Sequence, residues 1–184
     1  MANFKGTVFE STRMFTERQF GSGAVDRVLA ELGAPEREVL SGVQAIGWYP
    51  VEPILRYHHA LDRLFGTGDF SVCVAAGRFS ATWSMNTVLK VFLRFKSPMW
   101  LVDKATRVWG RYHDTGRWGV TTPGPNRITG TLHEFAVRDE AFCARLRGWL
   151  AGAIAATGGR DPSVTETQCA CRGQGNCVFQ LSWD

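Results

Sequence analysis

The end of the chain gathers three cysteines and a glutamate in one short segment: Glu166, Cys169, Cys171 and Cys177. Two runs of β-type residues, 163–171 and 176–183, flank a glycine-rich connection, which predicts a β-hairpin. A hairpin holds side chains from its two strands at close range, so the segment can present several thiols and a carboxylate to one point. This cluster of cysteines and a glutamate constrains the fold more than any other feature of the sequence.

Clustered cysteines are typical of metal ligands in a reducing compartment, and zinc takes three or four Cys, His or carboxylate ligands in a tetrahedron. If the turn is symmetric about Gln174, Cys171 lies directly opposite Cys177, and Cys169 projects to the same face one pair further along. The residues alone therefore leave open whether Cys169 or Cys171 is the ligand. Two alternatives are a disulfide between Cys171 and Cys177 and plain buried thiols.

Length and composition predict one globular domain spanning residues 1–184, because 45% of the residues are hydrophobic and 21% are charged. The net charge of +4 comes from scattered basic residues, so we expect no nucleic-acid partner. No apolar run is long enough for a membrane span, and the first fifteen residues lack a signal-peptide pattern. We therefore expect a cytoplasmic protein.

The pattern of apolar residues predicts an α+β fold, with N-terminal helices packed on a mostly antiparallel sheet. Residues 5–15 are expected as an extended arm or first strand, and residues 70–76 as strand or helix. A strand is predicted over residues 127–137. Helices are predicted over 22–32 (capped by Ser22), 35–40, 51–65, 84–95 and 139–156 (capped by Asp139).

The segment from Val164 to Trp183 resembles the end of 4-vinyl reductase domains, whose closing pattern is Glu-x-x-Cys, a short Gly-containing turn and then Cys-x-Phe. In the phenol-sensing members a further Cys from the preceding helix completes a zinc site, and Cys143 stands at that distance here. The resemblance implies that Cys171 is a bystander and that the zinc is structural. It implies these ligands: Cys143, Glu166, Cys169 and Cys177.

The same resemblance implies the fold shared by 4-vinyl reductase domains, haem-nitric-oxide-binding domains and TRAPP subunits. These domains are often homodimers, with an apolar cavity between helices and sheet. Large rings between residues 88 and 112 are expected to line such a pocket, although core packing explains each of them equally well. The expected pocket residues are Phe92, Phe95, Trp100, Trp109 and Tyr112.

The function expected from these observations is a small-molecule-binding sensor or carrier domain that takes an apolar or aromatic ligand and signals through a protein partner. The alternative is a homodimeric assembly module like a TRAPP subunit, with no functional ligand. A third hypothesis is an enzyme of tetrapyrrole or aromatic metabolism. A sensor should be stabilised by a ligand, an assembly module should not, and an enzyme should show an open metal position.

We expect no catalytic residues. The sequence has no dinucleotide-binding glycine pattern, no P-loop and no nucleophile elbow, and four zinc ligands would leave no position open for water. Each histidine is better explained as a structural residue than as a ligand or base: His58, His59, His113 and His133. A spatial pair of Cys73 with a histidine is left open.

Overall fold

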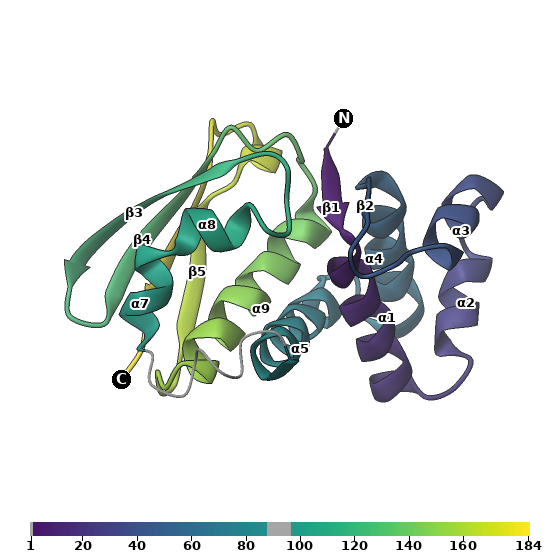
Figure 1. Ribbon diagram of the computed structural model, residues 1–184, viewed down its shortest axis with the longest axis horizontal. Helices are drawn as coiled ribbons and strands as arrows, with labels where there is room; N and C mark the ends of the chain where they lie inside the picture. Colours follow the sequence, from purple (N-terminus) through teal and green to yellow (C-terminus); the bar gives the residue numbers. More distant parts are fainter. Residues whose placement is uncertain (1, 88–96) are drawn as a thin grey trace.

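The computed structural model describes residues 2–87 and 97–184 as an α+β fold in three parts (Figure 1). Four N-terminal helices and a two-stranded sheet form one side, a four-stranded sheet with two short helices forms the other, and the two longest helices lie between them. The helices are α1 (Gly6–Phe20), α2 (Ala24–Ala30), α3 (Ala34–Ser41), α4 (Glu52–Phe65), α5 (Ser71–Thr87), α7 (Pro98–Asp103), α8 (Ala105–Trp109) and α9 (Glu140–Ala156). The strands are β1 (Asn3–Lys5), β2 (Trp48–Pro50), β3 (Arg117–Gly124), β4 (Arg127–His133), β5 (Ser163–Gln168) and β6 (Cys177–Ser182).

The N-terminal segment corrects the expectation of an extended arm over residues 5–15. Only β1 is extended, and it pairs antiparallel with β2, whereas α1 begins at Gly6. The buried face of α1 carries hydroxyl groups among its apolar side chains, and these groups hid the helical period. Ser11 and Thr12 each donate a hydrogen bond to the carbonyl oxygen of Val8, so their burial costs little.

The helices α2 and α4 follow their predicted spans closely. Helix α2 covers most of residues 22–32, but its N-cap is Gly23 in a left-handed conformation, so the predicted cap at Ser22 is wrong. Helix α4 has a proline in its first turn and buries a stripe at helical spacing, as its apolar period predicts. That stripe contains Ile54, Tyr57, His58 and Leu61. The ambiguous segment 70–76 is the start of α5, and the predicted helix 84–95 lies mostly outside the described residues.

The two central helices cross closely because glycines face the crossing point. A Cβ atom on Gly77 would overlap the carbonyl oxygen of Arg145, and one on Gly148 would overlap that of Val74. Gly152 gives a third close approach, where a Cβ would lie 2.9 Å from the Cβ of Ala81. The glycines let the backbones of α5 and α9 meet, and this crossing positions the first turn of α9 beside the closing hairpin.

The four-stranded sheet has the order β3-β4-β6-β5, with each neighbouring pair antiparallel. Strand β4 alternates as predicted, with Ile128, Gly130 and Leu132 buried. It ends at His133 rather than at residue 137, because Glu134 adopts a positive φ of 55° that breaks the extended ladder. No described helix is both long and apolar enough to cross a membrane.

The N-cap of α9 is confirmed and yields a prediction. The Asp139 carboxylate accepts a hydrogen bond from the backbone N–H of Phe142 at 2.9 Å, and its other oxygen lies 2.8 Å from Nε2 of His59. Asp139→Ala should lower the free energy of unfolding by about 1–2 kcal/mol in urea titrations, because an orphan N–H of the first turn loses its acceptor. Asp139→Ser keeps an acceptor at the cap, so it should lose clearly less. Equal losses would mean that capping contributes nothing here.

Candidate functional site: a thiol cluster and an apolar cavity

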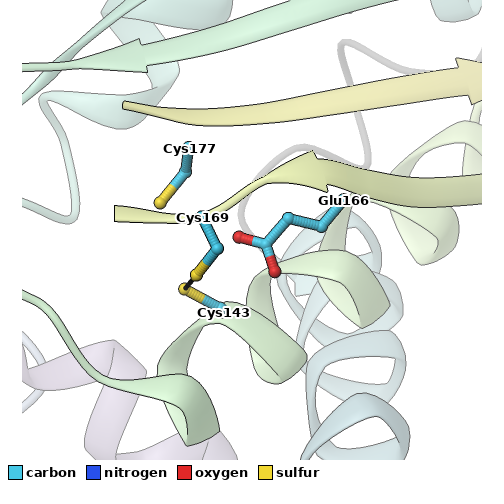
Figure 2. Close-up of side chains that lie close together, drawn as sticks. All are labelled: Cys143, Glu166, Cys169 and Cys177. Carbon is cyan, nitrogen blue, oxygen red and sulfur yellow. Dashed lines mark hydrogen bonds between the residues drawn. The ribbon is translucent and has the colours of Figure 1, made fainter. Parts of the chain in front are cut away.

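The structure brings together the four residues proposed as metal ligands. Figure 2 shows the side chains converging from the first turn of α9, from β5, from the residue just after β5 and from the start of β6. One ligand atom from each lies within 4.8 Å of the ligand atoms of the other three. The four residues are Cys143, Glu166, Cys169 and Cys177. Three of them are buried and Glu166 is half-buried, so the cluster lies beneath the surface of the hairpin.

The distances suit ligands that share one ion. The sulfur atoms of Cys143 and Cys169 lie 3.7 Å apart, which is about the separation of two thiolates in a tetrahedron with metal–sulfur bonds of about 2.3 Å. The backbone N–H of Ala170 donates to the sulfur of Cys177 at 3.4 Å, a bond of the kind that orients a thiolate ligand. Oε1 of Glu166 is buried without a described hydrogen-bond partner. A buried carboxylate oxygen in this position needs a proton or a cation.

The protons of the cluster are shared unequally. The interaction between Cys143 and Cys177 lowers the pKa of Cys177 to about 7 and, together with burial, raises the pKa of Cys143. Burial also raises the pKa of Cys169. Cys177 is therefore the thiol of these three that loses its proton most readily.

The fifth residue of the cluster, Cys171, lies close but outside the set of four. It belongs to a short 3₁₀ helix (Ala170–Arg172), and its sulfur is 3.9 Å from that of Cys143. The prediction of a strand through residue 171 is wrong, because β5 ends at Gln168 and the chain turns before the hairpin closes. All five cysteines are free thiols, so the alternative disulfide between Cys171 and Cys177 is not formed.

A cavity of about 110 Å³ lies between the central helices and the four-stranded sheet. Its wall is predominantly apolar, and it includes Trp109, Trp118, Trp149, Ile128 and Leu181. The wall residues belong to α1, α5, α7, α8, α9 and three strands of the four-stranded sheet. The cavity therefore lies where the helices pack on this sheet. Trp109 and Trp118 meet edge to face with ring centroids 5.8 Å apart, so the aromatic wall is held by ring contacts.

The structure bears differently on the five residues predicted to line the pocket. Trp109 and Tyr112 line the cavity, whereas the described wall does not include Trp100. Phe92 and Phe95 lie outside the described residues. The sequence analysis missed the part of the wall that comes from the sheet and from α9. The alternation of β4 already put Ile128 on an inward face, but nothing in the sequence showed which inward residues face a cavity.

The cavity wall also carries polar residues, among them Arg145 and His113. Arg145 is only 4% exposed, and burial lowers its pKa to about 10. Both ring nitrogens of His113 are inaccessible and lack a described hydrogen-bond partner. Burial, with a smaller contribution from the charge of Arg145, lowers the pKa of His113 to about 3. His113 is therefore neutral at physiological pH and can donate or accept a hydrogen bond.

The comparisons with known proteins identify the fold. No family model and no curated protein matches the sequence. An H-NOX protein from S. oneidensis in the Fe(II)NO state is similar over 98% of this chain and 99% of its own, at 16% identity and a TM-score of 0.78. The Fe(II) unliganded H-NOX protein from K. algicida gives 13% identity and a TM-score of 0.73, covering 98% and 96%. An IWP-051-bound H-NOX from Shewanella woodyi has 16% sequence identity and a TM-score of 0.67, and the match covers 97% of this chain and 94% of its own.

These neighbours correct the expected cofactor. They are described with Fe(II), so zinc as the cofactor, expected from the 4-vinyl reductase resemblance, is wrong. The residues of this chain do not fit a haem group either. A cavity of about 110 Å³ is far below the roughly 300–1,000 Å³ of pockets for larger ligands. His113, the histidine on its wall, is stacked on Trp109 with centroids 3.8 Å apart.

The likeness covers nearly the whole chain and extends to several H-NOX proteins, while the sequence identities stay between 12% and 16%. Similarity at this level of sequence identity establishes only the architecture. The ligand must be inferred from the residues of this chain. The narrower resemblance to 4-vinyl reductase domains stays a prediction. The chain has the α+β fold of H-NOX domains.

Proposed function

We propose that this chain is a non-catalytic small-molecule-binding domain, a sensor or carrier whose ligand occupies the cavity between α5, α9 and the sheet. The observation that carries the proposal is the apolar cavity itself, walled by three tryptophans at the boundary between the layers. An engineered apolar cavity of roughly 150 Å³ binds benzene, so a cavity of about 110 Å³ suits a ligand of one small ring. The H-NOX neighbours support the proposal, since they are described in NO-ligated and IWP-051-bound states.

The side chains that could carry thiol chemistry support a binding role rather than catalysis. The thiol of Cys73 donates to the backbone carbonyl oxygen of His58 at 3.7 Å, so its hydrogen is bound to the main chain. Burial raises the pKa of Cys73 to about 12, so the thiolate is not available at neutral pH. Cys73 therefore has the properties of a structural core residue.

We further propose that the thiol cluster holds a metal ion with a structural role. Three thiols and one carboxylate form a closed set of four ligands with no position for water, which is typical of structural sites. The ion would fasten the closing hairpin to the first turn of α9, the helix that also forms part of the cavity wall. Elemental analysis of the purified protein identifies the ion.

The cavity is tested by filling it. Ala153 is buried on the cavity wall, and Ala155 is exposed on the same helix. Toluene, phenol and indole should each raise the unfolding temperature of the wild-type protein and change the fluorescence of the tryptophans in the wall, with saturable binding. Ala153→Phe should abolish these effects because its ring occupies the cavity, whereas Ala155→Phe should retain them.

Two results would contradict the cavity assignment. One is the absence of saturable binding for every apolar molecule tested on the wild-type protein. The other is equal binding by the folded Ala153→Phe and Ala155→Phe proteins, which would place the ligand elsewhere.

The homodimer and the effector partner expected from the family resemblance stay predictions. Light scattering on the same samples tests whether the protein is a homodimer.

A further inference from the structure

Arg145 is a buried cation whose partners are all neutral. Its Nη2 donates to the hydroxyl of Ser80 at 2.9 Å and lies 3.4 Å from that of Ser11. Its Nε is buried and has no described hydrogen-bond partner. The residue also forms part of the cavity wall. The guanidinium therefore stands at the edge of the cavity with a donor unused.

The described part of the chain supplies no counter-ion for this charge. No described side-chain carboxylate pairs with Arg145, and residues 88–96 contain no Asp or Glu at all. A buried arginine without a paired anion is costly, because desolvation of the charge is not offset by Coulomb attraction. A side chain of this kind on an otherwise apolar wall is therefore explained most simply by an anion that comes from outside the chain.

Two further polar groups on the same wall also lack partners. The hydroxyl oxygen of Thr7 and both ring nitrogens of His113 are inaccessible to solvent and have no hydrogen bond within residues 2–87 and 97–184. The hydroxyl can donate, and a neutral imidazole can donate from one of its nitrogens. Together with Arg145, three residues of the cavity wall thus carry a donor that has no partner within the described part of the protein. Buried polar groups in native proteins are nearly always satisfied, so these donors favour an acceptor that enters the cavity.

We propose that the ligand of this cavity is a small aromatic carboxylate, with its ring against the tryptophans and its carboxylate paired with Arg145. This inference rests on the proposed function, since it names the class of molecule that the cavity binds. A carboxylate offers about four acceptor sites on two oxygens, enough for the guanidinium and for donors from Thr7 and His113. A neutral ring would leave the arginine unpaired, and a molecule much larger than one ring would not fit about 110 Å³.

The ligand pair benzoate and toluene separates this inference from the proposed function. At neutral pH benzoate is ionised and toluene is its neutral counterpart of similar size. Calorimetric titration of the wild-type protein should show benzoate binding at least about tenfold more tightly than toluene or benzamide, as expected for hydrogen bonds to a charged group. This comparison needs no variant, so it does not depend on how any substitution affects folding.

Variants locate the effect at the arginine. Arg145→Met should weaken benzoate binding by about 10- to 100-fold and leave toluene binding unchanged or tighter, because the cavity becomes wholly apolar. Arg147→Met, the same substitution two residues away at a position outside the cavity wall, should bind both molecules like the wild type. Thr7→Val preserves shape and should weaken benzoate alone, by a smaller factor than Arg145→Met.

The outcomes distinguish the two proposals. If the wild type binds toluene as tightly as benzoate, the cavity is a binding site but the carboxylate inference is wrong. If Arg145→Met binds benzoate like the wild type, the arginine does not hold the anion and the inference is again wrong. If the wild type binds neither molecule nor any other small apolar compound, the proposed function fails together with it.

Discussion

Replacing Cys169 with serine should abolish binding of the metal ion proposed for the thiol cluster and lower the free energy of unfolding by about 4 kcal/mol, the stabilisation expected when an ion is present at a thousand times its dissociation constant. Cys169 is 1% exposed and its sulfur lies 3.7 Å from that of Cys143. The hydroxyl of serine is a poor ligand in place of a thiolate, and metal binding in such sites contributes directly to folding. Elemental analysis gives the metal content, and urea unfolding gives the free energy.

Cys171 provides the matched control, because it is a neighbouring cysteine outside the set of four. Cys171→Ser should keep the full metal content and lose clearly less stability than Cys169→Ser, because Cys171 contacts the cluster without being one of its four ligands. A chelator should destabilise the wild type and Cys171→Ser but leave Cys169→Ser unchanged. Equal metal loss from the two serine variants would overturn the choice of Cys169 as the ligand.

Gly148→Ala should destabilise the protein by about 3 kcal/mol, at the upper end of the cost of overpacking, because the added methyl group meets backbone rather than a mobile side chain. The Cβ would overlap the carbonyl oxygen of Val74, so α5 and α9 would have to move apart. That separation would widen the wall around Arg145, and the variant should also bind aromatic ligands more weakly. Thermal unfolding and the titrations described above measure both effects.

Gly175 is the control for this prediction, since nothing lies within 4 Å of a Cβ built on it. Gly175→Ala should change the free energy of unfolding by less than about 0.5 kcal/mol, typical of surface substitutions. If Gly148→Ala is as stable as Gly175→Ala, the helix crossing is not set by the glycines, and the account of how α9 is positioned is wrong.

The closing part of the fold could be predicted because its determinants are local. Asp139 as an N-cap and the pairing of the last two strands each depend on a few neighbouring residues, and the structure contains both, although the first of these strands ends at Gln168 rather than at residue 171. The sequence showed that three cysteines and Glu166 gather in one hairpin, but the choice of Cys169 over Cys171 came from the family resemblance. Cys143 likewise required the family resemblance, because no spacing rule brings a helix to a hairpin.

Long-range packing explains what the sequence did not show. Helix α1 was missed because Ser11, Thr12 and Thr16 are on its buried face, where their hydroxyls bond to backbone carbonyls or to Ser80. Arg145 was passed over because a charged residue on a helix is normally solvated, and only the crossing of α5 and α9 buries it. A cavity forms where side chains from elements distant in the sequence leave space between them. The periodicity of apolar residues does not show where such a space lies.

The central claim, that the cavity holds a small molecule, is tested most directly by weighing the purified protein under native and denaturing conditions in a mass spectrometer. The account predicts that the native mass of the wild type exceeds the chain mass by one metal ion and one small organic molecule, which denaturation releases. It predicts that Ala153→Phe retains the metal ion and loses the organic molecule. A wild-type native mass equal to chain plus metal alone, unchanged after incubation with benzoate or toluene, would contradict it.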